Sequence, residues 1–187
     1  PCTCGVVFRF GPEGYQPLVS FVDKVGIFPT TSLIQAQNGL LYGTTGQGGG
    51  LSHGSAYRLA LDGSGLRSMH AFTAQEGAPN ARLMEAPDGH FYGTTFLSGG
   101  IGNAFRMAAD GAVEIIHTFT DDEGHFSRGG FTLASDNKMY AVTVGGTGGA
   151  GLGAVIRMSL DGSVEVLHRF TGADGASPAS GLVVGPD

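Results

Sequence analysis

Three histidines occupy equivalent places along the chain, and three imidazoles are a common ligand set for zinc. His70, His117 and His168 each stand two residues before a phenylalanine that ends a strand-like segment. Zinc requires each nitrogen within about 2.0–2.1 Å, whereas neighbouring strands lie about 4.8 Å apart. Histidines on the outer strands of three separate sheets therefore cannot converge on one ion. We expect structural histidines that form hydrogen bonds between neighbouring sheets.

Four arginines also recur, and a ring of guanidinium groups is suited to binding anions. They are Arg9, Arg58, Arg106 and Arg157. Because a buried charge must be paired, we interpret them as structural residues whose stems pack and whose heads meet backbone carbonyls or neighbouring carboxylates. Three recurring tyrosines receive the same structural interpretation: Tyr42, Tyr92 and Tyr140.

One acidic loop breaks this regularity, and function is best sought where equivalent positions differ. Asp121, Asp122 and Glu123 stand together in it and are candidate calcium ligands, since calcium takes oxygen donors. The alternation of an EF-hand loop is absent, which favours a solvated acidic turn. No His-Glu-x-x-His helix or phosphate-binding loop is present, and we predict no catalytic residue and no cofactor.

The composition narrows the class of protein. The chain has 187 residues, of which 34 are glycine and none is tryptophan, and its formal net charge is −6. A hydrophobic share of 41% is too high for a disordered polar tract. The acidic balance with scattered basic residues argues against a nucleic-acid partner. No apolar run approaches the roughly 20 residues of a membrane span.

Two cysteines, Cys2 and Cys4, stand at the start of the sequence. In an extended strand, residues two apart are separated by roughly 6.6 Å, which is at the edge of ordinary disulfide geometry. We expect ordinary strand residues or a bond to a cysteine of another chain, and their redox state stays open.

The sequence is a tandem repeat. A glycine that begins a strand-like segment recurs at steps of 49, 48 and 51 residues: Gly5, Gly54, Gly102 and Gly153. A second marker, Leu41-Tyr42-Gly43-Thr44-Thr45, returns at 91–95 and loosely at 139–143. A period of this size is typical of propeller blades or helical arrays.

The apolar residues within each unit alternate with a period of two, which predicts strands and excludes helices. Asp-Gly and Asn-Gly pairs separate the segments and predict tight primed hairpin turns. In one unit the expected strands are 81–86, 90–95, 103–108 and 113–119. Four antiparallel strands per repeat predict an all-β fold, a β-propeller with blades of about 49 residues.

We expect a single repeat array over residues 1–187 with about four blades, alone or within a larger ring or assembly. A partial blade covers 1–21, further blades cover about 31–72, 81–119 and 130–170, and a closing strand covers about 179–184. One strand of the terminal blade is missing. Three alternatives stay open: a closed four-bladed ring, a fragment of a longer array, or a protomer that assembles with other chains. Incomplete terminal units favour the last two.

The recurring markers resemble the GloVer tandem repeat of bacterial proteins. The string Asp-Gly-x-Phe-Tyr-Gly-Thr-Thr is followed by Gly-Gly, Gly-x-Ala-Phe-Arg-Met, Asp-Gly and His-x-Phe. The pattern resembles Kelch propellers more distantly. The likeness covers essentially the whole chain and implies a propeller-like protein that is extracellular or displayed at the cell surface. It implies no catalytic mechanism.

Two functions follow as hypotheses. The first is a non-enzymatic extracellular module that binds a protein or glycan ligand, or that assembles with itself through the incomplete terminal blade. The alternative is a carbohydrate-active enzyme, a glycan hydrolase or lyase with its site at the mouth of the propeller channel. Such an enzyme needs paired carboxylates there, and the sequence does not place Asp122, Glu123 or Glu85 in that way.

Overall fold

The computed structural model describes residues 4–29, 31–97, 100–145 and 151–185, and its regular elements are all β-strands. The prediction of an all-β fold is therefore confirmed. The strands are β1 (Val6–Gly11), β2 (Gly14–Ser20), β3 (Ile34–Gln35), β4 (Leu41–Thr45), β5 (Ser55–Leu59), β6 (Arg67–Ala71), β7 (Ala78–Pro79), β8 (Met84–Glu85), β9 (Phe91–Phe96), β10 (Gly102–Met107), β11 (Val113–Thr118), β12 (Thr132–Leu133), β13 (Met139–Thr143), β14 (Ala154–Met158) and β15 (Val164–Arg169).

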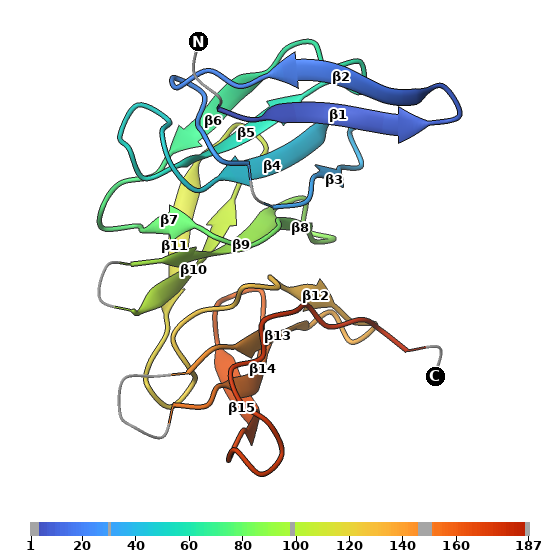
Figure 1. Ribbon diagram of the computed structural model, residues 1–187. Coiled ribbons are helices and arrows are strands. Elements are labelled where there is room, and N and C mark those ends of the chain that lie inside the picture. The colour runs from blue at the N-terminus through green and yellow to red at the C-terminus, as the bar shows by residue number, and fades with distance from the viewer. Residues whose placement is uncertain (1–3, 30, 98–99, 146–150, 186–187) are drawn as a thin grey trace.

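The strands form antiparallel sheets that follow one another along the chain (Figure 1). A two-stranded sheet, β1–β2, comes first. In the next three sheets the strands lie side by side in the order of the sequence, β3 to β6, β8 to β11 and β12 to β15. β7 also pairs with β9, next to β8. Each of these three units thus contributes four antiparallel strands in sequence order, as the sequence predicts, and β7 adds a fifth strand to the middle one.

The outer two strands of each sheet form the same irregular hairpin. The register shifts between Val7 and Phe8 in the first sheet, and at the matching step between Ala104 and Phe105 in the third. The other two sheets shift at the same step. A bulge at a fixed place increases the local twist in every sheet equally, so β1–β2 has the geometry of a third and a fourth strand.

The hairpin turns differ from the predicted primed turns. The amide of Ala108 donates to the carbonyl of Ala112 (2.9 Å), so the loop between them has three residues rather than two. Gly111 takes a φ of 100°, whereas Asp110 is not among the residues with positive φ. The Asp110 carboxylate instead accepts the Ala112 amide at 3.0 Å. This side-chain bond stabilises an ordinary turn before the glycine, so a primed turn is not needed.

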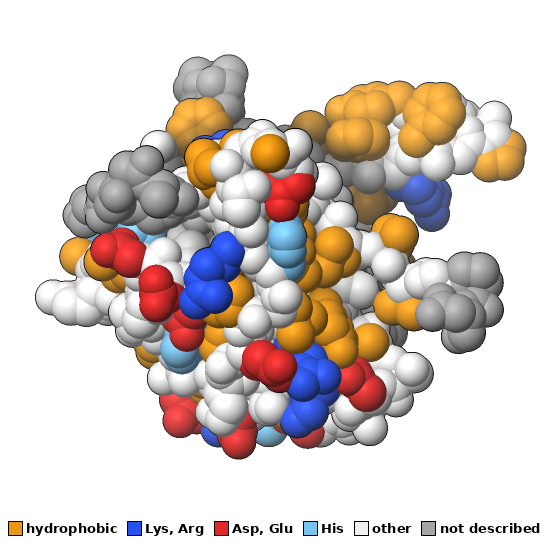
Figure 2. Space-filling model, turned by 90° about the horizontal axis from the view of Figure 1, so that it is seen from below, with side chains coloured by type: hydrophobic (Ala, Val, Ile, Leu, Met, Phe, Trp, Pro, Cys, Tyr) orange, Lys and Arg blue, Asp and Glu red, His pale blue; other side chains and the backbone are white. Residues whose placement is uncertain are grey.

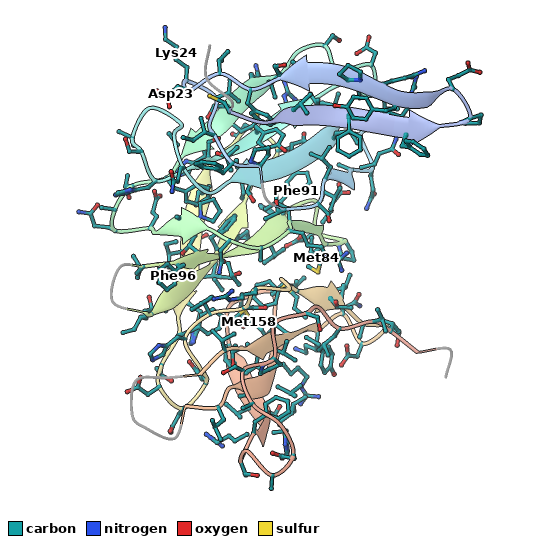
Figure 3. All side chains as sticks on the ribbon, in the orientation of Figure 1. Asp23, Lys24, Met84, Phe91, Phe96 and Met158 are labelled. Atoms are coloured by element: carbon teal, nitrogen blue, oxygen red, sulfur yellow. The ribbon has the colours of Figure 1, made fainter. Side chains whose placement is uncertain are left out.

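The described residues form three hydrophobic core clusters, each shared by two neighbouring sheets; we call these clusters the seams. In the middle seam, Tyr42 and Phe72 pack against Phe91 and Phe105. The rings of Tyr42 and Phe91 are stacked with centroids 4.3 Å apart. Figure 3 shows Phe91 on the upper side of its sheet and Met84 on the lower side, facing the next seam.

The ends of the described chain do not pair with each other. The predicted closing strand at 179–184 is not a β-strand in the structure. It lies along the last sheet, where Thr132 Oγ1 donates to the carbonyl of Leu182 at 2.7 Å, and β1–β2 lies at the opposite end (Figure 1). No sheet closes a ring among the described residues. Among the described residues, no second strand of a terminal blade lies beside this segment to pair with it.

Cys4 is buried and disulfide-bonded. The expectation of an ordinary strand cysteine is therefore wrong for this residue, and Cys2 lies outside the described residues. In the part of the chain that the structure describes, no helix is long and apolar enough to cross a bilayer.

Candidate functional site

Each recurring histidine is bound by a carboxylate six residues further on; we call these pairs the clasps. His70 Nε2 lies 3.1 Å from Glu76 Oε1, His117 Nε2 lies 2.8 Å from Glu123 Oε2, and His168 Nε2 lies 2.7 Å from Asp174 Oδ2. An ionised carboxylate only accepts hydrogen bonds, so Nε2 carries the hydrogen. The partner lies in the loop after the same strand and not, as expected, in a neighbouring sheet.

The clasp loop also connects its sheet to the next one. Thr95 Oγ1 donates to the carbonyl of Glu76 at 2.5 Å, and Asn103 Nδ2 donates to the same oxygen at 3.0 Å. Thr143 Oγ1 donates to the carbonyl of Glu123 at 2.5 Å. The side chains of Glu76 and Glu123 thus order their loops, while their backbone carbonyls bind the following sheet. This geometry holds the two halves of a seam together and leaves no imidazole nitrogen aimed at a shared point.

Hydrogen bonds set the charge of the clasp carboxylates. Burial of Glu76 and Glu123 favours the neutral acid, but bonds from a threonine amide and from the imidazole outweigh it, so the pKa of both carboxyls lies below its usual value. At the exposed third clasp, the amide and hydroxyl of Thr171 lower the pKa of Asp174 to about 2. All three carboxylates are therefore ionised at neutral pH.

In the three larger sheets, each recurring tyrosine on the second strand lies opposite a recurring arginine on the third strand. Arg106 Nη2 is 2.5 Å from Glu114 Oε2 on the next strand, and Arg157 pairs with Glu165 in the same way. Arg9 donates to the amide oxygen of Gln16, and Arg58 faces Arg67 across the strand pair. The guanidiniums sit on separate sheets and form no ring.

The recurring tyrosines bind the turn before their own strand. Tyr92 OH donates to Asp88 Oδ2 at 2.7 Å, and Tyr140 OH donates to Asp136 Oδ2 at 2.9 Å. Tyr42 OH instead accepts from Asn38 Nδ2 at 2.9 Å. Burial and the Asp88 carboxylate raise the pKa of Tyr92 well above its usual value, so this phenol is a neutral hydrogen-bond donor.

The acidic loop separates its three carboxylates. Asp121 Oδ1 binds the buried His125 at Nε2 (2.7 Å), and Glu123 belongs to a clasp. Asp122 is exposed, with its nearest cation at Arg169, 3.9 Å away. Among the described residues no three metal-ligating side chains gather at one point. The structure therefore does not bring the candidate calcium ligands together.

The same loop contributes two other residues to an open hollow of about 440 Å³. Its lining includes Asn80, Phe96, Phe126 and Arg128, with Gly46 and Ala78 beside them. The rings of Phe96 and Phe126 meet edge to face with centroids 4.9 Å apart. The Arg128 guanidinium lies 5.7 Å from the centre of the Phe126 ring, a cation–π distance. Figure 3 shows Phe96 at the end of its sheet away from Met84.

Backbone hydrogen bonds fix the segment that carries Phe126 and Arg128. The amide of His125 donates to the carbonyl of Val144, and the amide of Val144 donates to that of Phe126, both at 2.9 Å. Thr94 Oγ1 donates to the carbonyl of Ser127 at 2.8 Å. Arg128 thus projects from a backbone segment that these hydrogen bonds fix in place. It also borders a second hollow of about 450 Å³ next to Val144 and Ser177.

The lining sets the chemistry of the hollow. Phe96, which is 39% exposed, offers an apolar ring backed by the largely buried Phe126, Arg128 offers a positive charge, and the Asn80 side chain offers amide hydrogens, with its oxygen 3.2 Å from Thr94 Oγ1. Among the described lining residues of both hollows there is no Asp, Glu, His or Cys. The hollow therefore resembles a binding site with few convergent polar groups and offers no general acid or base.

The stacked antiparallel sheets and this site define a propeller-like repeat module. The chain belongs to the Gloeobacter/Verrucomicrobia repeat family, whose model matches residues 2–187. No curated protein matches the sequence.

Two solved structures show the same fold. A gluconolactonase from Xanthomonas campestris aligns with a TM-score of 0.62 and 22% identity, over 94% of this chain and 57% of its own. TolB from Acinetobacter baumannii aligns with a TM-score of 0.58 and 17% identity, over 88% of this chain and 38% of its own. The chain thus spans only part of each of these propeller-like proteins.

The sequence singles out the loop that contributes to the hollow, but it offers the carboxylates of that loop as candidates and not the two residues that line the hollow. The break in symmetry at 121–128 marks the loop, whereas the carboxylates draw attention away from Phe126 and Arg128. Phe96 also carries a signal, because it follows the Thr-Thr marker at a place where another unit has Gly46. Asn80 carries no signal in the sequence that distinguishes it.

Proposed function

We propose that the protein is a non-enzymatic, extracellular binding module that holds an acidic glycan at the hollow formed by Phe96, Phe126 and Arg128. The observation that carries the proposal is Arg128, an exposed cation above an aromatic wall with no carboxylate in the described lining. The extracellular placement follows the expectation from the repeat family.

The ligand class follows from the lining. The exposed ring of Phe96, backed by the largely buried ring of Phe126, suits the C–H face of a sugar ring, and aromatic rings supply most of the contact area in such sites. Arg128 presents a planar fork of donors that matches a carboxylate. A uronic acid combines both features in one unit, and the Asn80 amide offers donors for its hydroxyls.

The test is calorimetric titration with an oligogalacturonate, next to a neutral galacto-oligosaccharide of equal length. We expect saturable binding of the acidic sugar only. Arg128→Gln should weaken it at least about tenfold, which corresponds to roughly 1.4 kcal/mol. Arg67→Gln is the matched control, since Arg67 is an exposed arginine on β6 outside the hollow. Equal binding by Arg128→Gln and the parent protein would refute the proposal.

A second candidate is a carbohydrate-active enzyme, which the fold of the gluconolactonase from Xanthomonas campestris leaves open. The same samples decide between the two candidates. Incubation with the oligosaccharide, followed by mass spectrometry of the sugar, should return it uncleaved. Cleavage that disappears in a variant of a nearby carboxylate would replace the binding module with a hydrolase or lyase.

A further inference from the structure

The two-stranded sheet β1–β2 has an open edge. β1 pairs with β2 on one side, and no described strand pairs with its other side. Its counterparts β5, β10 and β14 each have a strand on both sides. We propose that the open edge of β1 binds an extended segment with the Tyr-Gly-Thr-Thr pattern of β4 and β9, supplied by another chain that carries this repeat.

The backbone of β1 offers the hydrogen-bonding groups of a third strand. The carbonyl of Gly5 accepts the amide of Phe21, as that of Gly102 accepts the amide of Phe119. Backbone groups alternate from one edge to the other along a strand. Every second residue from Val6 therefore directs its amide and carbonyl to the open edge, and Phe8 corresponds to Phe105, the partner of Gly93 on β9.

A groove runs beside this edge. A hollow of about 260 Å³ is lined by Val6, Phe8, Pro29, Ser32, Leu33 and Tyr57. In the three larger sheets the corresponding place, between the first strand and the third, holds the second strand. The groove thus continues an interface that the molecule already forms three times.

The exposed face of the hairpin supports the same occupant. Phe8 is 55% exposed and Phe10 is 77% exposed, whereas their counterparts Phe105 and Met107 are 0% exposed. Hydrophobic side chains gather over this projecting hairpin in Figure 2, at the upper right. An apolar surface next to unpaired backbone groups favours β-strand addition.

The register selects glycine opposite Phe8. A Cβ on Gly93 would lie 2.5 Å from Phe105 Cζ, and a Cβ on Gly43 would lie 2.6 Å from the Tyr57 hydroxyl. Third-strand rings therefore occupy the space that a side chain on the second strand would need. A segment that binds β1 in this register must carry glycine where Phe8 meets it.

The test uses a fluorescent peptide with the sequence of residues 88–97 of this chain. We expect saturable binding by fluorescence anisotropy, together with slower hydrogen exchange at the amides of Val6, Phe8 and Phe10. The Arg128→Gln protein should bind the peptide as the parent does, which separates this proposal from the glycan site.

Two control peptides test the register. Valine in place of Gly93 adds the clashing side chain, and sarcosine there removes the amide that pairs with the open edge while adding no Cβ. Each should bind at least about tenfold more weakly. Absence of saturable binding, binding of either control with parental affinity, or protection elsewhere than β1 would overturn the proposal.

Discussion

At the residue scale, each clasp joins an imidazole to a carboxylate. These groups often act in catalysis, but here they serve a structural purpose. Each imidazole donates to a carboxylate that also accepts a threonine amide, at 2.8 Å for Thr73 and 2.9 Å for Thr120. Each ring also meets the following phenylalanine edge to face, as His117 does with Phe119. Both contacts hold the ring in place, and its Nε2 serves the loop.

Because of the clasps, we expect the folded protein to lose stability in acid. The pKa of Glu76 and Glu123 is lower in the folded chain than in the unfolded chain, so their contribution is complete above about pH 4.3 and is lost as pH falls through the folded value. Glu123→Gln should reduce the change in unfolding free energy between pH 6 and pH 3, measured by urea denaturation. An unchanged difference between these two pH values would contradict this account of Glu123.

The sequence locates the clasp histidines by their recurrence but not their partners. The signal is present in hindsight, because His-x-Phe-Thr is followed after two residues by Glu or Asp and then glycine in three units. The short loop returns the carboxylate to the histidine within six residues, which a search for partners across separate sheets overlooks.

At the element scale, strand positions are predictable because the repeat shows them several times. The expected strands 90–95, 103–108 and 113–119 correspond closely to β9, β10 and β11. The expected strand 81–86 reduces to β8, because Leu83 packs into the middle seam and Ala78–Pro79 pairs with β9 instead. Packing against other parts of the fold shortens that strand, and the local sequence does not reveal this packing.

The second strands β4 and β9 have no room for a side chain at their glycine, because an aromatic ring of the third strand lies there, whereas β13 has Ala141 opposite Ile156. Gly93→Ala should cost about 1–3 kcal/mol, the range for overpacking, because the new Cβ would lie 2.5 Å from Phe105 Cζ and 3.2 Å from Leu83 Cδ2. Gly11→Ala is the matched control, since Gly11 has no heavy atom within 4 Å of its Cβ position. Urea denaturation measures both variants. Equal stability of the two would show that the ring moves aside freely.

At the scale of the whole molecule, the side chains of each seam are covered by a sheet on both sides. The outer faces of the two end sheets of the described array have no such cover. Phe8, Phe10 and Tyr15 are exposed at one end. At the other end Tyr140 and Phe170 are only partly buried, although their counterparts Tyr42 and Phe72 are fully buried. Apolar surface of this kind marks an interaction site, and two different end faces favour head-to-tail contact.

Sedimentation equilibrium tests this association. The average mass should rise above 19.1 kDa as the protein concentration increases, and Phe10→Glu should bring it back toward that value by charging one end face. Leu61→Glu serves as the control, because Leu61 is an exposed apolar residue in a hairpin turn. A mass of 19.1 kDa at every concentration would refute head-to-tail association.

The seams carry a consequence for how such chains change in evolution. Because every cluster of buried side chains is shared by adjacent sheets alone, duplication of one unit adds a sheet and a seam while leaving the existing ones as they were. Gene lengthening by whole units therefore needs no compensating substitution elsewhere, as in other nearest-neighbour arrays. Variation in copy number becomes an accessible route by which relatives acquire different lengths on one architectural plan.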